Sequence, residues 1–177
     1  MATAIEKRDT TGPAKVEVLT EAKGGNYPPG KMLVSTPLEI DAYVRRIPEG
    51  RVLTLGALRA ALAKDHQADY TCPITTGMFL RVVAEAAEEE RASGVAGKAG
   101  GKTLAPYWRV VRDDGSLIDK LPGGDAAQAK LLEREGVHIM HMGKIRRLSD
   151  VEHYAWSPPP LGKGGRGKPP DPKAKRR

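Results

Sequence analysis

Residues 54–92, TLGALRAALAKDHQADYTCPITTGMFLRVVAEAAEEERA, predict two consecutive helices joined by a polar connection. Thr54 is a good N-cap residue for the first helix. The apolar side chains that follow it recur at helical spacing, namely Leu55, Leu58, Ala61 and Leu62. The second helix is expected from about residue 74 to residue 92, after Cys72-Pro73. This order favours a helix-turn-helix arrangement, but any small helical bundle has the same spacing, so both interpretations stay open.

Helix signals also flank this stretch on both sides. Thr36-Pro37-Leu38-Glu39 predicts a helix start with a capping box, and Pro48-Glu49-Gly50 ends that helix. Farther along the chain, Asp125 is a candidate cap for a helix that stops at Gly136. Ser149-Asp150-Val151-Glu152 is a second capping box, which opens a short terminal turn ending at Trp156.

Strand signals alternate with these helices. Residues 106–111 are expected to form a strand, in which Tyr107 and Trp108 would face opposite sides. Asp113-Asp114-Gly115 predicts a tight turn, and residues 137–140 have a strand-like composition. The body, residues 33–156, is therefore expected to be one α+β domain.

The regions outside this body differ from it in composition. Residues 1–32 are rich in Gly, Pro and charge and are expected to form a flexible N-terminal arm. Residues 93–102 have the composition of a flexible linker, and residues 157–177 are expected to be a basic disordered tail.

The tail carries most of the net charge of +7. Residues 36–156 hold equal numbers of basic and acidic residues, whereas the tail holds one acidic residue, Asp171, and seven basic residues, Lys163, Arg166, Lys168, Lys173, Lys175, Arg176 and Arg177. Such a cluster favours nucleic-acid binding, because cations that neutralise phosphates release counterions. A solubilising tail is the alternative.

The composition excludes several classes of protein. No stretch of about 18 apolar residues exists, so a transmembrane span is not expected. A single cysteine, Cys72, excludes a disulfide framework and favours a reducing cytoplasm. The N-terminal residues 1–20 lack the apolar core of a secretory signal.

Four segments in a fixed order carry a resemblance to a known family. They are Ile47-Pro48-Glu49-Gly50-Arg51-Val52, Ile74-Thr75-Thr76-Gly77-Met78, Pro106-Tyr107-Trp108-Arg109-Val110-Val111 and Leu131-Leu132-Glu133-Arg134-Glu135-Gly136. Together, residues 33–156 resemble the DNA-binding domain of the O6-alkylguanine-DNA alkyltransferases and their alkyltransferase-like relatives. The resemblance implies a winged-helix-like helix-turn-helix domain of the alkyltransferase C-terminal type, with the recognition helix starting near Ile74.

The resemblance also implies what this chain lacks. In the family, a cysteine takes the alkyl group from O6 of a flipped guanine, with help from a neighbouring histidine and a glutamate. Here Tyr107 stands at the cysteine position and Trp108 at the histidine position, and only Glu135 of that relay remains. A phenol is a poor nucleophile at neutral pH, so no alkyl transfer and no catalytic residue are expected. The family's intercalating arginine corresponds to Ile74, and its helix-start tyrosine to Leu55.

The candidate nucleic-acid-binding residues follow from these matches: Ile74, Thr75, Thr76, Gly77, Arg81, Tyr107, Trp108 and Arg109. Ile74 could act as an apolar wedge, and the N–H groups of residues 75–77 could meet a phosphate. Ordinary helix capping explains residues 75–77 equally well. Tyr107, Trp108 and Arg109 could stack a base and hold a phosphate, or could be core residues around a structural arginine.

Other residue patterns point to ordinary structural roles. Glu88-Glu89-Glu90 is expected to be a solvated helix face. Cys72 is expected to be a small core residue. His138 and His141 do not match a metal site, and no metal or cofactor is expected.

The leading hypothesis is a non-catalytic, cytoplasmic, monomeric protein that binds duplex DNA, including duplex with O6-alkylguanine, and works with other repair proteins but not with membranes. A second hypothesis is a protein-interaction adaptor on a vestigial alkyltransferase fold. A third is a residual enzyme that uses Cys72 or Tyr107.

Overall fold

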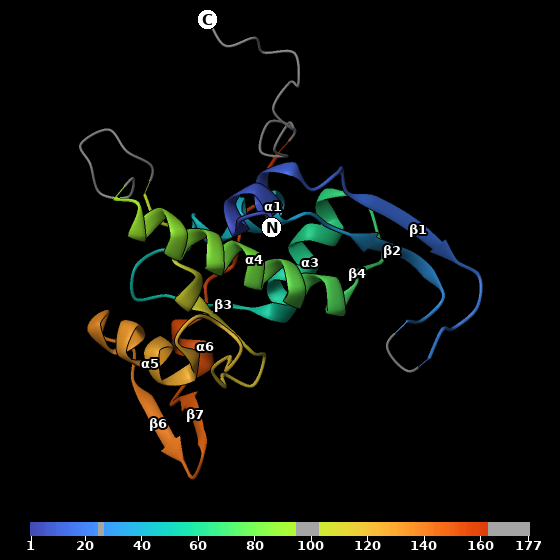
Figure 1. Ribbon diagram of the computed structural model, residues 1–177. Coiled ribbons are helices and arrows are strands. Elements are labelled where there is room, and N and C mark those ends of the chain that lie inside the picture. The colour runs from blue at the N-terminus through green and yellow to red at the C-terminus, as the bar shows by residue number, and fades with distance from the viewer. Residues whose placement is uncertain (25–26, 95–102, 163–177) are drawn as a thin grey trace, which may run out of the picture.

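A computed structural model describes residues 1–24, 27–94 and 103–162 and shows a mixed helix-and-strand protein (Figure 1). Its helices are α1 (Ala4–Thr10), α2 (Pro37–Val44), α3 (Leu55–Asp65), α4 (Pro73–Ala92), the 3₁₀ turn η1 (Tyr107–Arg109), α5 (Gly124–Arg134) and α6 (Val151–Tyr154). Its strands are β1 (Lys15–Leu19), β2 (Gly30–Val34), β3 (Leu53–Thr54), β4 (Tyr70–Thr71), β5 (Val110–Val111), β6 (Ile139–Met142) and β7 (Ile145–Leu148).

The core lies where α2, α3 and α4 meet. Fully buried side chains from each helix form one cluster, including Ile40, Tyr43, Leu58, Leu62 and Val83. The predicted caps form: Thr36 accepts from the N–H of Glu39, and Thr54 accepts from the N–H of Ala57. The helical predictions for this stretch are therefore confirmed, because apolar spacing and capping agree there.

The capping box predicted at α2 is only half formed. The Glu39 carboxylate does not return to the helix start but lies 2.6 Å from Nε2 of His66, the residue that follows α3. A local motif has thus become a contact between α2 and α3.

The strands form three small sheets. β1, β2 and β4 form a three-stranded sheet, in which β1 is antiparallel and β4 parallel to β2. β3 pairs with β5 in parallel, and β6 with β7 antiparallel. Figure 1 shows the β1–β2 hairpin and the β6–β7 hairpin extending from the helical body in different directions. The strand predicted at residues 137–140 forms two residues later, as β6, and β7 was not predicted.

The prediction of a flexible arm over residues 1–32 is wrong for α1 and β1. Helix α1 packs on α4, where Arg8 is buried and its guanidinium lies 2.7 Å from a carboxylate oxygen of Glu90. Strand β1 completes a sheet with β2. The composition was misleading for α1 because its stability comes from α4, far along the chain, and for β1 because it pairs with the next strand, β2.

The prediction that Glu88-Glu89-Glu90 is a solvated face is also wrong. Glu88 accepts a hydrogen bond of 2.6 Å from the Tyr107 hydroxyl. Glu89 accepts from the backbone N–H groups of residues 4 and 5 at the start of α1. Glu90 pairs with Arg8 and Arg45. Each carboxylate has a different specific partner, which a charge run alone cannot reveal.

Three predictions of local geometry are corrected in the second half. Tyr107 and Trp108 lie in a 3₁₀ turn, not in a strand, because the extended stretch begins only at Val110. The N-cap residue of α5 is Gly123, in the left-handed conformation, while the Asp125 carboxylate pairs with Arg146 at 2.9 Å. At α6 the N-cap residue is Asp150 and not Ser149.

The turn predicted at residues 113–115 forms. The N–H of Gly115 bonds the carbonyl of Arg112, and Gly115 has a φ of +83°, a conformation that favours glycine. The Asp113 carboxylate then accepts from the N–H of Gly56 at 2.6 Å, which ties this turn to the start of α3.

The tail prediction is corrected for its first residues. Arg46 donates to the carbonyl of Pro159 at 2.8 Å, and Leu161 packs against the main core cluster. The remainder of the tail, residues 163–177, and most of the predicted linker, residues 95–102, lie outside the described residues. No helix in the described ranges combines the length and the apolarity that crossing a membrane requires.

Candidate nucleic-acid interface

The first turns of α4 border a pocket of about 460 Å³. The pocket lies between the start of α3, the first half of α4 and the loop that precedes α5. Its lining residues are Leu55, Pro73, Ile74, Gly77, Met78, Leu80, Arg81, Arg112, Ile118, Lys120 and Leu121. Three segments distant in sequence therefore meet at one depression.

Two large apolar side chains beside the pocket face solvent. Ile74 is 54% exposed and Met78 is 59% exposed, one helical turn apart on α4. Leu80 and Leu121, which are buried, form part of the pocket's apolar lining. An exposed apolar pair next to an apolar depression is typical of a binding surface.

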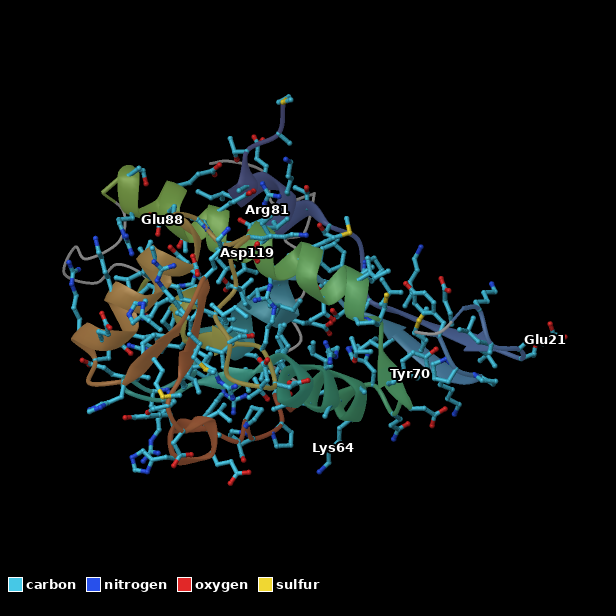
Figure 2. The ribbon with its side chains drawn as sticks, turned by 90° about the horizontal axis from the view of Figure 1, so that it is seen from below. Glu21, Lys64, Tyr70, Arg81, Glu88 and Asp119 are labelled. Carbon is cyan, nitrogen blue, oxygen red and sulfur yellow. The ribbon has the colours of Figure 1, made fainter. Side chains whose placement is uncertain are left out.

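Cationic side chains line the same depression. Arg81 pairs with Glu85 one turn on at 2.7 Å, and Arg112 pairs with Asp119 at 2.9 Å. The hydrogen bond from Arg112 holds the pKa of Asp119 below its usual range. Figure 2 shows Arg81 and Asp119 at this side of the molecule, with Glu88 farther along α4. Lys120 forms no ion pair with any described residue.

The candidate residues on α4 divide between this surface and the interior. Ile74, Gly77 and Arg81 line the pocket. Thr76 is fully buried, and its hydroxyl donates to the carbonyl of Cys72 at 2.7 Å. The Thr75 hydroxyl makes a longer bond, 3.4 Å, to the same carbonyl. Both threonine hydroxyls thus donate to the backbone of their own helix, and neither caps α4, whose N-cap Cys72 makes no side-chain capping bond.

The candidate residues of η1 lie away from the pocket. Tyr107 is 3% exposed, and burial together with its hydrogen bond to Glu88 raises the pKa of its hydroxyl well above the usual range. Trp108 donates from Nε1 to Glu135 at 2.8 Å. The Arg109 guanidinium bonds both oxygens of Glu135 and the carbonyl of Ile47. Their polar groups thus hold η1 against α4, against the C-cap residue of α5 and against the segment that follows α2.

Glu135 is the centre of this structural network. It also accepts from the N–H of Gly50 at 3.1 Å. Burial disfavours its charged form, but the bonds from Arg109, Trp108 and Gly50 outweigh burial, and the pKa of the carboxyl is lowered. The residue that the resemblance places in a proton relay is here the ion-pair partner of Arg109, a half-buried arginine.

Cys72 lies outside the pocket lining. It is 4% exposed, and its Sγ lies 4.0 Å from the Tyr27 hydroxyl in a small cluster with Leu19 and Met32. Burial disfavours the thiolate, but hydrogen bonds from residues 74, 75 and 27 lower the pKa of the thiol. This environment matches the expected core role of Cys72.

A larger depression, of about 650 Å³, lies along the outer side of α3. Its lining includes small residues such as Ala60 and Ala63, together with Arg59, which is held 3.6 Å from Asp113. None of the candidate residues lines it. The pocket at α4 is the better candidate site because it combines exposed apolar side chains with cations.

Eight of the eleven lining residues are not among the candidates from the sequence, including Leu55, Met78, Arg112 and Lys120. Met78 has a sequence signal, because it lies one turn after Ile74 on the same helical face. Arg112 and Lys120 have none, since only the turn at residues 113–115 brings that loop back to α4.

The chain matches no protein family model and no curated protein. Its backbone is similar to two solved structures from S. pombe. One is Atl1 in complex with damaged DNA containing O6-carboxymethylguanine, with 21% identity, 68% of this chain and 95% of that chain covered, and a TM-score of 0.44. The other is ATL in complex with DNA, with 20% identity, 68% and 94% covered, and a TM-score of 0.42.

Proposed function

We propose that this protein binds duplex DNA without catalysis, through the first half of α4, and that the pocket beside α4 receives an unstacked base such as an alkylated guanine. The observation that carries the proposal is the exposed pair Ile74 and Met78 beside a pocket lined by apolar side chains and cations. We further propose that it acts in the cytoplasm, in recognition of alkylation damage.

The side chains of this surface are of the types needed to unstack a base, to receive it in the pocket and to bind phosphates. An apolar wedge can unstack a base step, which a purely polar surface does poorly. A pocket with an apolar lining can stack the displaced base, while Arg81, Arg112 and Lys120 supply positive charge for phosphates. The helix-turn-helix formed by α3 and α4 is part of this proposal.

The placement of the two candidate nucleophiles supports a non-catalytic role. Neither Cys72 nor Tyr107 is among the pocket-lining residues. The Tyr107 hydroxyl is bound to Glu88, which makes its ionisation harder. An alkyl group held in the pocket would therefore contact neither of these two side chains as a lining residue.

Fluorescence anisotropy with the full chain tests the proposal. The ligands are undamaged duplex, the same duplex with one O6-methylguanine, and single-stranded RNA. Met78→Ser is expected to weaken duplex binding roughly tenfold, since it removes most of the apolar surface that Met78 would bury against DNA in the complex. Met142→Ser is the matched control, because Met142 is similarly exposed, at 55%, but lies on β6. Equal affinities of the two variants and the parent chain would contradict the proposed surface.

A protein-interaction module is the second candidate function, supported by the β6–β7 hairpin. Met140, Met142 and Ile145 lie on one exposed face of this hairpin. Exposed apolar faces of this kind mark protein-binding surfaces. A full chain without measurable duplex affinity at low salt would favour this function over DNA binding.

A further inference from the structure

One edge of strand β1 has no described partner strand. Strand β1 is the outer strand of the sheet ordered β1-β2-β4, and no described residue pairs with its outer side. Residues 15–18 are all exposed, Val16 at 42% and Val18 at 68%. Figures 1 and 2 show this hairpin extending from the body, with Glu21 near its far end.

Hydrogen bonds to β4 determine which groups of β2 face β1. The N–H of Asp69 bonds the carbonyl of Lys31, and the N–H of Cys72 bonds the carbonyl of Leu33. Because the backbone groups of a strand alternate in direction, residues 31 and 33 face β4, and residues 30, 32 and 34 face β1.

The β1–β2 register then shows in which direction the backbone groups of each β1 residue point. Lys15, Glu17 and Leu19 lie opposite residues 34, 32 and 30 and bond to them. The backbone N–H and C=O groups of Val16 and Val18 therefore point outward, to the free edge. Both valines also have exposed side chains.

A second copy of the chain can pair with this edge in few registers. Outward-pointing residues must lie opposite each other, and a symmetric antiparallel pair places its two-fold axis at one residue. An axis at Glu17 would set two glutamates directly opposite, which is unfavourable. An axis at Val16 sets Lys15 opposite the partner's Glu17, and does so twice.

We propose that two copies of this protein associate antiparallel through β1, with the two-fold axis at Val16. The N–H and C=O of Val16 bond those of the partner's Val16, and Val18 pairs with the partner's Ala14. The two sheets become one six-stranded sheet. This departs from the expected monomer.

The dimer is expected to be weak and concentration-dependent. Pairing through one short strand buries less surface than stable dimers bury, which is on the order of 1,200 Å² or more. No residue of β1 lines the pocket at α4, so the proposed dimer does not depend on the proposed DNA-binding surface.

Sedimentation velocity of the full chain over micromolar to millimolar concentrations tests association. Amide hydrogen exchange by NMR tests the edge directly. Protection of the Val16 and Val18 amides is expected to rise with concentration, while the Lys15 and Glu17 amides, already bonded to β2, stay protected throughout.

Charge reversal tests the register. Lys15→Glu and Glu17→Lys are each expected to weaken association roughly tenfold, because two opposite-charge pairs become like-charge pairs. The double variant K15E/E17K restores the pairs and is expected to recover the affinity. Lys23→Glu and Glu49→Lys are the matched controls, since they make the same charge changes at exposed positions outside β1.

Val16→Pro tests the edge without charge changes. No described residue accepts a hydrogen bond from the Val16 N–H, so proline is expected to remove only the intermolecular bond, and circular dichroism checks the fold. The proposal is overturned if the protein stays monomeric at millimolar concentration, or if association is unaffected by V16P. It is also overturned if Val16 is protected at every concentration, because a segment of the same chain then occupies the edge.

Discussion

At the scale of single residues, Glu135 shows how one side chain can connect several parts of the chain. Its carboxylate joins Arg109 and Trp108 of η1 to Gly50, which precedes β3. The Arg109 and Glu135 side chains are 14% and 10% exposed, so each charge depends on the other for compensation. The same hydrogen bonds fix η1 to Glu135 and to the backbone at Ile47.

Glu135→Gln is expected to destabilise the protein by about 2 kcal/mol at neutral pH, because it leaves the largely enclosed Arg109 guanidinium without its counter-charge. Urea unfolding measures the loss. Glu133→Gln, at an exposed position on α5, is the control and is expected to change little.

The difference in unfolding free energy between the parent chain and Glu135→Gln is expected to depend on pH in a known direction. The pKa of Glu135 is lowered on folding, so its contribution is complete above the ordinary value of 4.5 and is lost as the pH falls through the lower folded value. The stability gap between parent and variant should therefore narrow below pH 4.5. A gap that stays constant into that range would argue against this ion pair.

At the scale of elements, α1 is a part of the helical core rather than an arm. Its first turn is capped by Thr3 and by Glu89 of α4, and Arg8 lies in a buried cluster with Glu90 and Asp41. A short helix is unstable alone, so α1 exists because α4 offers these partners.

Arg8→Met is expected to cost about 3 kcal/mol of folding free energy, since it removes one cation from a buried ion cluster that also includes Arg45. Lys7→Met, at the preceding exposed position, is the matched control. Denaturant unfolding gives the free energy, and hydrogen exchange of the α1 amides shows whether the helix detaches. Equal stability of the two variants would mean that α1 does not support the core.

At the scale of the whole molecule, charge is divided between a neutral body and a basic C-terminal segment. Residues 163–177 contain all seven basic residues of the predicted tail and its single acidic residue. Charge of this kind adds affinity for phosphates without reading a base sequence. In the proposed function, base selection would belong to the pocket beside α4.

Truncation after Gly162 is expected to weaken duplex binding and to reduce the salt slope, log Kd against log salt, by up to about 6 units. The chain is truncated after Gly162 and not after Trp156, because Pro159 accepts a hydrogen bond from Arg46 and Leu161 packs on the core. Anisotropy titrations at several salt concentrations measure the slope. An unchanged slope would remove the tail from the binding mechanism, whereas binding by the pocket would remain testable through Met78.

The amino-acid sequence by itself determined the elements whose signals are local. Thr36 and Thr54 cap α2 and α3 as predicted, α4 follows Cys72-Pro73, and Gly115 makes the turn. Apolar spacing, capping and turn chemistry act within a few residues, so they can be recognised without knowledge of the fold.

Only the tertiary structure decided which of these residues contact one another. It gave Glu88, Glu89 and Glu90 three different partners, placed Arg109 on Glu135, and brought Arg112 and Lys120 to the pocket beside α4. The physical reason is that burial and charge compensation depend on residues far apart in sequence, and the energy of a buried charge is set by the partner that the fold places beside it.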